Sequence, residues 1–369
     1  MTDRPTIVLS CGEMSGDLHA GRLVAHLRER LPRHRVVAFG GERCAQAGAE
    51  LVFHYRDYAI LGFTGVLASL PRLWRLERAL RSRLRAADLF IGVDYPGLNL
   101  RLAAYARRLG VPVLYYISPQ VWAWGAGRIP KMARVIDKLA VILPFEEAFF
   151  RARGVSAEFV GHPLVVDEKP PEPMPWEARE GVGLLPGSRA QEVTRILPVL
   201  LGAAARLAAR GSADRFVIGR SPAVPRATYE RIIARSGVAA IIDDDAAAVI
   251  RRSRLALVAS GTATLQTALM ETPLVVVYRV SPLNYWLARG LVTVDDIGLV
   301  NVVLGKRVAP ELVQGAATPS ALAAAGAALL EDEAQAEAMR ARFRGLRALL
   351  GGGRGSARVA EMAAELVGA

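Results

Sequence analysis

Short apolar segments alternate with segments of helical periodicity along almost the whole chain, and this alternation constrains the fold more than any other feature. In the first half, the segments predicted as buried strands are Thr6–Ser10, Arg35–Gly40, Asp88–Asp94, Val113–Ile117, Leu139–Leu143 and Glu158–Gly161. Helical patterns, such as Asn99–Leu109 and Glu146–Arg153, lie between most of them. This order is typical of βαβ units built on a parallel sheet.

The alternation stops at a proline-rich segment and then starts again. Residues 168–181 read EKPPEPMPWEAREG, and neither a helix nor a central strand accommodates the four prolines at 170–175. Beyond it, the predicted strands are Val182–Leu185, Arg215–Gly219, Ala240–Asp243, Leu255–Ala259 and Leu274–Arg279. We therefore predict an α/β protein with two Rossmann-like doubly wound domains, 1–167 and 182–350, joined by a linker at 168–181. Ligands of open α/β sheets bind at the carboxyl ends of the strands, so the two domains are expected to face a cleft there.

The tail of the chain is alanine-rich and helical, with a break at GGGRG (351–355). The final helix, Ser356–Val367, is expected either to cross back to the first domain or to pair with another chain. The region 356–369 is therefore assigned to the first domain or to a partner, and a homodimer is compatible with the sequence.

Cysteine content and hydropathy predict a protein of the reducing cytoplasm. Cys11 and Cys44 are the two cysteines of the chain and form no CxxC pair, so neither a cysteine metal site nor a disulfide framework is expected. The first ten residues, MTDRPTIVLS, do not resemble a signal peptide. No stretch reaches the roughly 18 uncharged apolar residues of a membrane span.

The chain is strongly basic, with 47 lysines and arginines against 35 acidic residues. Such a charge attracts nucleic acid, anionic lipid or phosphorylated substrates, although an ordinary solvated surface explains it equally well. The segment 69–85, SLPRLWRLERALRSRLR, is a basic amphipathic helix suited to lying on an anionic membrane with its leucines inserted. A helix packed on the sheet would show the same pattern. The residues predicted at the membrane are Leu70, Leu73, Trp74, Arg75 and Arg78.

Two glycine-containing turns in the second half are suited to binding an anion. LLPGSR ends a strand with Gly187, Ser188 and Arg189, where glycine admits a close approach and arginine presents a planar fork to phosphate. The segment beginning VASGTATLQ places Ser260, Gly261 and Thr262 at the start of a helix, whose free N–H groups attract negative charge. An ordinary capped turn and close helix–sheet packing are the structural alternatives. Neither turn is a GxGxxG or Walker A loop, which argues against NAD and ATP.

Candidate catalytic residues lie in the first half. Asp94 ends an apolar strand in IGVDYPGLN, where it is suited to act as a general base or to cap the next helix. Trp122 and Trp124 follow two tyrosines. They are suited to stacking on a sugar ring or lining an acyl chain, and packing in the core is the structural alternative. Between the first strand and a helix expected from Leu18 lies a polar turn that carries two carboxylates and so repels phosphate. Its candidate residues are Gly12, Glu13, Ser15, Gly16, Asp17 and His19.

These residues belong to a set of motifs that resembles the lipid-A-disaccharide synthase family. The motifs occur in family order over nearly the whole chain: GEMSGDLHAG (12–21), YISPQVWAW (116–124), LPFE (143–146), FVGHPL (159–164), LPGSRAQEV (185–193), ASGTATLQ (259–266) and NVVLG…PELVQ (301–314). The resemblance implies an inverting GT-B glycosyltransferase that needs no cofactor and no metal. It implies that the enzyme joins UDP-2,3-diacylglucosamine to the lipid acceptor 2,3-diacylglucosamine 1-phosphate. The products would be a β-1,6-linked disaccharide phosphate and UDP. The resemblance further implies that the enzyme works at the inner-membrane surface and binds no nucleic acid.

The resemblance also implies roles for single residues. Asp94 matches the candidate base, while Glu13, Ser15 and Asp17 match the acceptor-side turn. Residues 187–189 and 260–262 match the nucleotide side, with Asn301 and Gln314 near the donor. His19 either reaches the cleft or sits on the first turn of its helix.

Two departures from the family pattern stand out. Gln266 replaces a glutamate that holds the ribose, and Gly97 replaces a carboxylate after the base. The alternatives are a UDP-sugar epimerase or hydrolase of the same fold and a non-catalytic basic protein that binds anionic lipid or nucleic acid.

Overall fold

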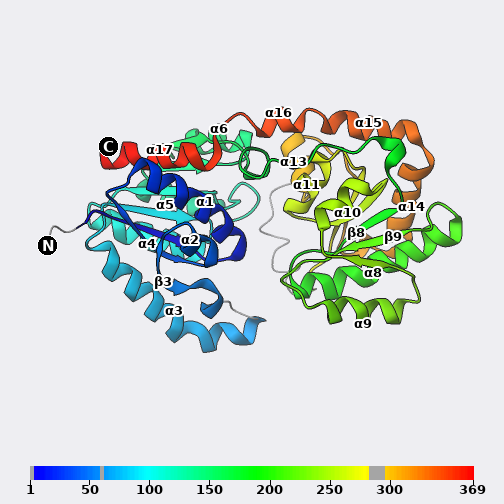
Figure 1. The fold of residues 1–369 in the computed structure, drawn as a ribbon, viewed down its shortest axis with the longest axis horizontal. Coiled ribbons are helices and arrows are strands. Elements are labelled where there is room, and N and C mark those ends of the chain that lie inside the picture. The colour runs from blue at the N-terminus through cyan, green and yellow to red at the C-terminus, as the bar shows by residue number, and fades with distance from the viewer. Residues whose placement is uncertain (1–3, 59–61, 282–295) are drawn as a thin grey trace. The chain divides into compact units, whose positions relative to one another are not determined.

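The computed structural model describes residues 4–58, 62–281 and 296–369, and for residues 62–70 it describes the backbone alone. The chain forms two compact units (Figure 1). Unit 1 comprises Met1–Lys169 together with Leu350–Ala369, and unit 2 comprises Pro170–Leu349. No helix among the described residues is both long enough and apolar enough to cross a membrane.

Unit 1 is built on a parallel sheet with the strand order β3-β2-β1-β4-β5-β6-β7. The strands are β1 (Thr6–Cys11), β2 (Arg35–Gly40), β3 (Glu50–His54), β4 (Leu89–Val93), β5 (Val113–Tyr116), β6 (Lys138–Val141) and β7 (Ala157–Phe159). All but β3 were expected from the sequence. The strand β3 has one exposed and four half-buried residues at the sheet edge, so it lacks the continuous apolar run of the other strands.

Helices cover both faces of the unit 1 sheet. They are α1 (Met14–Arg30), α2 (Glu42–Gln46), α3 (Gly62–Leu84), α4 (Pro96–Arg108), α5 (Ile129–Val135), α6 (Pro144–Arg151), α7 (Pro163–Val166) and α17 (Gly355–Val367), with single 3₁₀ turns η1 (Tyr55–Tyr58) and η2 (Ala126–Arg128). The helices α1 and α17 pack together against one face, and α3, α4 and α5 pack against the other (Figure 1). The final helix was expected either on the first domain or on a partner chain, and in this structure α17 packs on the first domain.

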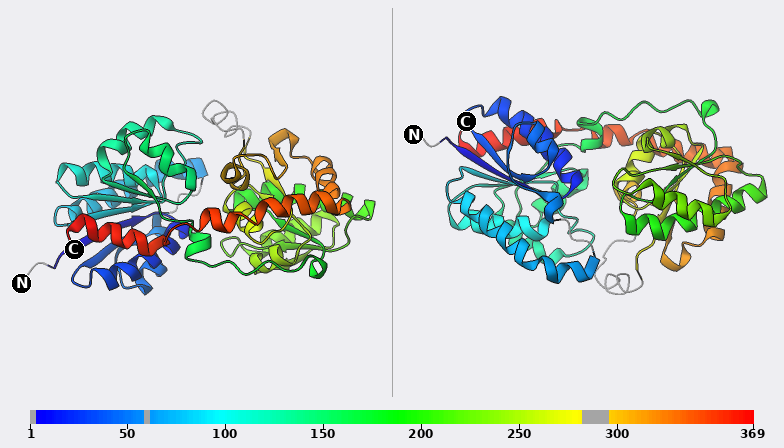
Figure 2. Two further views of the ribbon diagram at one scale, coloured as in Figure 1. Left: turned by 90° about the horizontal axis from the view of Figure 1, so that it is seen from above. Right: turned by 60° about the horizontal axis from the view of Figure 1, so that its bottom comes forward.

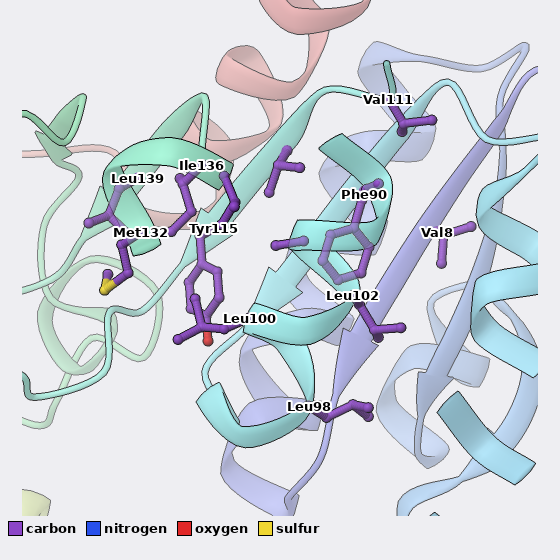
Figure 3. Close-up of a cluster of buried hydrophobic side chains, with 14 of the residues drawn as sticks. Val8, Phe90, Leu98, Leu100, Leu102, Val111, Tyr115, Met132, Ile136 and Leu139 are labelled. Atoms are coloured by element: carbon purple, nitrogen blue, oxygen red, sulfur yellow. The ribbon is translucent and has the colours of Figure 1, made fainter. Parts of the chain in front are cut away.

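The core under α3, α4 and α5 is continuous and apolar. Phe90 of β4, Tyr115 of β5 and Leu98 and Leu102 of α4 belong to one cluster of essentially buried side chains (Figure 3). Burial of each such side chain contributes roughly 1.5–3 kcal/mol, so this layer fixes the ends of β4 and β5 firmly.

Unit 2, coloured from green to orange in Figure 2, is a second α/β unit. Its parallel sheet has the strand order β10-β9-β8-β11-β12-β13. Its strands are β8 (Val182–Leu185), β9 (Phe216–Gly219), β10 (Ile241–Asp243), β11 (Leu255–Ala259), β12 (Leu274–Tyr278) and β13 (Glu311–Val313), the last of which was not expected from the sequence. The helices are α8 (Ala190–Arg210), α9 (Arg226–Ser236), α10 (Ala246–Arg252), α11 (Thr262–Leu269), α13 (Leu299–Leu304), α14 (Pro319–Glu331), α15 (Glu333–Phe343) and α16 (Leu346–Leu350), with η3 (Trp176–Ala178) and η4 (Gln314–Ala316).

The proline-rich segment packs onto unit 2 beyond its first residues. Arg179 is buried there, and its guanidinium donates to the carbonyls of Met174, Met270 and Glu271 and to Thr272 Oγ1. Burial, with the charge of Arg340 second, lowers the pKa of Arg179 to about 10. The segment therefore ends as a buried anchor, and Lys169 and Pro170 mark the boundary between the units.

Both sheets have a switch point, where the strand order reverses. In unit 1 it lies between β1 and β4, and in unit 2 between β8 and β11. Cys11 pairs with Val93 and Leu185 pairs with Val258, so the loops that follow these strands leave their sheet side by side. A switch point is where doubly wound sheets bind ligands.

Candidate active site

The loop after β4 holds Asp94 in a constrained backbone geometry. Asp94 and Tyr95 both have φ near +47°, a left-handed conformation that costs a non-glycine residue roughly 1–3 kcal/mol. The Asp94 carbonyl accepts hydrogen bonds from Asn99 Nδ2 at 2.7 Å and from the Tyr115 hydroxyl at 2.6 Å, and the Asp94 N–H donates to the Tyr116 carbonyl. These backbone hydrogen bonds fix the position of Asp94 at the switch point, and with it the place from which its half-buried side chain extends.

The loop after β1 lies directly against that turn. A Cβ on Gly12 would fall 2.3 Å from Cγ of Tyr95, so only glycine leaves room for the Tyr95 ring. Burial, followed by the negative charge of Glu13, raises the pKa of Tyr95, which places the Glu13 carboxylate near the same ring. The structure therefore brings Gly12 and Glu13 together with Asp94.

The helix α1 begins at Met14, four residues earlier than the sequence predicted. Ser15 is consequently exposed on the first turn, and Gly16 is buried, where a Cβ would meet Cys11 Cβ at 3.3 Å. The expected polar turn is therefore limited to Gly12 and Glu13. The remaining candidates lie on a helix whose positions are set by packing.

The Asp17 carboxylate binds backbone N–H groups of the protein, whereas it was expected on the substrate side. Its carboxylate is buried, accepting hydrogen bonds from the N–H groups of Gly41, Arg43 and Cys44 at 2.7–3.2 Å. These groups are the free donors at the start of α2, which a carboxylate satisfies well. Cys11 and Cys44 approach Asp17 closely, with their sulfurs 4.0 Å apart, but both carboxylate oxygens are already occupied by N–H groups.

His19 lies on α1, and His162 is the N-cap residue of α7. Burial is the main cause that lowers the pKa of His19 to about 4, and the charge of Arg22 is the second. Burial, followed by the charge of His19, lowers the pKa of His162 to about 4 as well. His162 Nδ1 accepts a hydrogen bond from the Leu164 N–H. Both imidazoles are neutral at neutral pH, so His19 offers no positive charge to a phosphate.

The two tryptophans of the SPQVWAW motif have different environments. Trp122 Nε1 donates to Glu146 at 3.0 Å, and the same buried carboxylate accepts from Ser118 Oγ and the Leu143 N–H. Burial raises the pKa of Glu146. Trp124 is 43 % exposed, with the Arg128 guanidinium 4.9 Å from its ring centre. Trp122 is therefore a scaffold residue, and Trp124 is the tryptophan a ligand can reach.

Arg128 and Glu146 were missed in the sequence. Arg128 Nη1 is buried and has no hydrogen-bond partner among the residues that the structure describes. The spacing of WAWGAGR around a glycine turn is the one signal that pointed to it. The LPFE motif that carries Glu146 was noticed for its resemblance alone, because its role depends on the loop of Trp122.

The basic helix α3 turns its leucines inward. Leu76, Leu80 and Leu84 belong to the buried core, as in the alternative of a helix packed on the sheet, so these three leucines are not available to a membrane. Trp74 is 62 % exposed, with the Arg78 guanidinium 5.4 Å from its ring centre, and Arg75 and Arg78 are exposed. Leu73 is half-buried, and the Leu70 side chain lies outside the described residues.

In unit 2, a carboxylate of the chain itself occupies the first anion-binding turn. Gly187 has φ +107°, and Glu192 Oε2 accepts from the N–H groups of Ser188 and Arg189 at 2.9 and 3.2 Å. The two N–H groups expected to receive phosphate are therefore already bonded. The Arg189 side chain is 68 % exposed, and its guanidinium lies 3.7 Å from the other Glu192 oxygen.

The second turn has no side-chain cap among the described residues. Gly261, at φ +146°, is the N-cap of α11, and the preceding Ser260 N–H donates to the Val277 carbonyl. Ser260 donates its hydroxyl to the Ile297 carbonyl, while Thr262 is exposed. Gln266 is half-buried one turn further on. Free N–H groups at a helix start, backed by the helix dipole, suit an anion.

Asn301 and Gln314 stabilise loops of unit 2, in contrast to the donor contacts expected of them. The buried Asn301 donates to the Ala309 carbonyl and to Glu311 Oε1, and accepts from the N–H groups of Val308 and Ala309. This uses the full hydrogen-bonding capacity of its amide. Gln314 pairs through both amide atoms with the Val280 backbone.

Known structures share this architecture over nearly the whole chain. The glycosyltransferase of kitacinnamycin superposes with a TM-score of 0.59 at 19% identity, covering 99% of this chain and 100% of that chain. The UDP co-structure of S. aureus MnaA gives 0.64 at 11% identity, covering 99% and 97%. At such identities the likeness establishes the fold alone. Two doubly wound parallel sheets in one chain, each with its turns at a switch point, define a protein of the GT-B class.

The sequence relationship is more specific. The family model for lipid-A-disaccharide synthetase matches residues 7–366. The lipid-A-disaccharide synthase of Myxococcus xanthus (strain DK1622) is 43% identical over 336 residues, covering 88% of this chain and 87% of that protein. The chain belongs to the lipid-A-disaccharide synthetase family, which confirms the resemblance inferred from the motifs and makes this protein a glycosyltransferase.

Proposed function

We propose that this protein joins UDP-2,3-diacylglucosamine to 2,3-diacylglucosamine 1-phosphate, giving the β-1,6-linked disaccharide 1-phosphate and UDP with inversion. The observation that carries the proposal is the family match over residues 7–366. The epimerase alternative rests on fold likeness to UDP-N-acetylglucosamine 2-epimerases at 11% identity, against 43% identity to a synthase. A non-catalytic role leaves the constrained Asp94 unexplained.

Asp94 is the proposed general base. In a one-step inversion, its carboxylate takes the proton of the acceptor 6-hydroxyl as that oxygen attacks the sugar C1 carbon and the C1–O bond to UDP breaks. Positioning such a base contributes about 10²–10⁴-fold to a rate. Support comes from the pinned Asp94 backbone, since three hydrogen bonds hold it at the switch point.

Four other unit 1 residues are proposed to bind the acceptor. The Glu13 carboxylate accepts hydrogen bonds from sugar hydroxyls, the Ser15 hydroxyl donates or accepts them, and Trp124 offers an exposed ring for stacking. Arg128 suits the acceptor phosphate, because its buried Nη1 lacks a partner among the described residues. Gly12 and Asp17 act through the backbone they position.

Unit 2 is the proposed UDP site. The leaving diphosphate gains negative charge, so fixed donors at that end lower the barrier. The proposed donors are the N–H groups of Gly261 and Thr262, which form no hydrogen bond within the described residues, and the exposed Arg189 guanidinium. Gln266 is the proposed ribose contact, with one accepting oxygen.

The protein is further proposed to work peripherally at the cytoplasmic face of the inner membrane, where both acylated substrates reside. Support comes from the exposed Trp74 beside Arg75 and Arg78 on α3. Tryptophan with flanking cations suits the boundary between lipid headgroups and acyl chains. Association into a homodimer stays a prediction.

The test is product formation by the purified full chain in detergent micelles. With both substrates, we expect stoichiometric UDP and a disaccharide 1-phosphate by mass spectrometry; without acceptor, we expect no UDP. UDP release that needs no acceptor would identify a hydrolase, and conversion of the donor to an isomeric UDP-sugar would identify an epimerase. Either result contradicts the proposal.

A further inference from the structure

A basic hollow opens on the surface of unit 1 between α3, α4 and α5. Its volume is about 190 Å³, and its lining residues are Arg81, Arg101, Ala104, Tyr105, Arg108 and Lys131. The α4 residues recur at helical spacing, so Arg101, Tyr105 and Arg108 share one face. Arg81 and Lys131 approach from the neighbouring helices. Four cationic side chains of three helices therefore meet at one hollow.

The charge of this hollow is largely uncompensated. Arg81 and Arg101 share a single carboxylate, Glu77, at 2.6 and 3.0 Å. Arg108 and Lys131 have no ion-pair partner in the described part of the chain, although Lys131 is half-buried. A half-buried ammonium gathered with three guanidinium groups attracts an anion.

Tyr105 organises the arginines around the hollow. Its ring centre lies 5.1 Å below the Arg81 guanidinium, and its hydroxyl accepts a hydrogen bond from Arg85 Nε at 3.2 Å. Guanidinium groups held on an aromatic ring lose less freedom when they bind phosphate, because their planar forks are already oriented. The hollow is therefore a prearranged anion site.

The hollow is continuous with the exposed tryptophan of α3. Trp74, Arg78, Arg81 and Arg85 follow one another at i, i+4, i+7 and i+11, so they form one stripe along the helix. The stripe begins with Trp74 under Arg78 and ends with the two arginines on Tyr105. An interfacial tryptophan on the same stripe sets the depth at which the basic residues meet a lipid surface.

We propose that the hollow binds the headgroup phosphate of an anionic membrane lipid and orients unit 1 on the bilayer. This inference rests on the membrane-surface part of the proposed function and adds a defined lipid site to it. Phosphate chemistry is shared by lipid headgroups and free phosphate, and the Trp74 stripe favours the lipid.

The test compares two double variants of equal charge. Arg108→Gln/Lys131→Gln empties the hollow of its two unpaired cations. The matched control is Arg30→Gln/Arg33→Gln, at the end of α1 on the opposite face of the sheet, where neither side chain forms a hydrogen bond or ion pair within the described residues. Binding is measured by cosedimentation with vesicles of phosphatidylglycerol and phosphatidylethanolamine, and with phosphatidylcholine vesicles.

Each basic residue at an anionic surface contributes roughly fivefold to partitioning, so the hollow variant is expected to bind phosphatidylglycerol vesicles about 25-fold more weakly. The control is expected to stay within about threefold of wild type. An equal loss in both variants would mean general surface charge, and wild-type binding by the hollow variant would remove the site. Both outcomes overturn the proposal.

Two further arms separate the source of the phosphate and the enzyme activity. If inorganic phosphate alone saturates the hollow at low millimolar concentration while the hollow variant still binds vesicles normally, the ligand is a free anion and the lipid assignment is overturned. Turnover in detergent micelles should be unchanged in the hollow variant. Absence of turnover in the wild type would refute the proposed function, and the vesicle result would still decide the lipid site.

Discussion

The switch points of the two units use the same sheet edge in opposite ways. In unit 1 the left-handed positions are Asp94 and Tyr95, both at φ near +47°, whereas in unit 2 they are Gly187 and Gly261. Glycine adopts this region freely and leaves space, while aspartate and tyrosine adopt it at a cost. Unit 1 therefore uses strain to place a side chain, whereas unit 2 turns its backbone at glycine without that cost. This is the difference expected between a proton acceptor and an anion cradle.

Each unit also contains a carboxylate that binds its own backbone. Asp17 satisfies the start of α2 in unit 1, and Glu192 satisfies the start of α8 in unit 2. Sequence motifs of this chain therefore include acidic residues that stabilise the fold as well as acidic residues that can face a ligand. Burial and hydrogen-bond saturation separate them, because an acid whose oxygens are filled by N–H groups has little left for a substrate.

The largest expected effect separates the two aspartates of unit 1. Asp94→Asn keeps the shape and tolerates the left-handed backbone but cannot accept the proton, so kcat should fall about 10³-fold at unchanged stability. Asp17→Asn should instead lower the free energy of unfolding by about 2 kcal/mol, because charge-assisted bonds to N–H groups are lost. Steady-state kinetics and urea unfolding of both variants check this. If Asp94→Asn keeps more than a tenth of the activity, another group is the base.

The next effect concerns pH, because all five histidines lie in unit 1: residues 19, 26, 34, 54 and 162. The folded pKa of His19 and of His162 is about 4, below the unfolded value near 6.5, so the unfolded chain binds more protons between these values. Stability is therefore full above pH 6.5 and is lost as the pH falls toward 4, by at most about 3 kcal/mol for each group.

Hydrogen exchange at pH 7 and pH 5, corrected for intrinsic rates, should show unit 1 amides losing protection before those of unit 2. His19→Gln should remove about half of the acid sensitivity. His26→Gln, at a half-buried site on the same helix, should leave it unchanged. Earlier loss of protection in unit 2 would show that these buried imidazoles do not govern the acid response.

Sequence patterns predicted the layout of this molecule better than the state of its side chains. Buried strands such as Leu255–Ala259 are continuous apolar runs, so they could be placed closely, whereas the edge strands Glu50–His54 and Glu311–Val313 lack that signal. Motif position predicted Asp94 and Arg189 as site residues. It could not reveal that Asn301 is saturated, because its partners at 308–311 are defined only by the folded loop.

The smallest expected effect tests the nucleotide side of the comparison. The half-buried Gln266 of α11 forms no hydrogen bond within the described residues, so its amide oxygen is available to one ribose hydroxyl. Gln266→Glu adds a second acceptor and a charge, and charge-assisted bonds are roughly twice as strong as neutral ones. The KM for the donor should fall about fivefold at unchanged kcat, as for a contact made equally in the ground state and the transition state.

The control is Gln335→Glu, at an exposed residue of α15, which adds the same charge away from the switch point and should leave KM unchanged. A KM that does not move in Gln266→Glu would mean that the ribose is held by other groups, so that unit 2 would recognise its donor through the diphosphate alone.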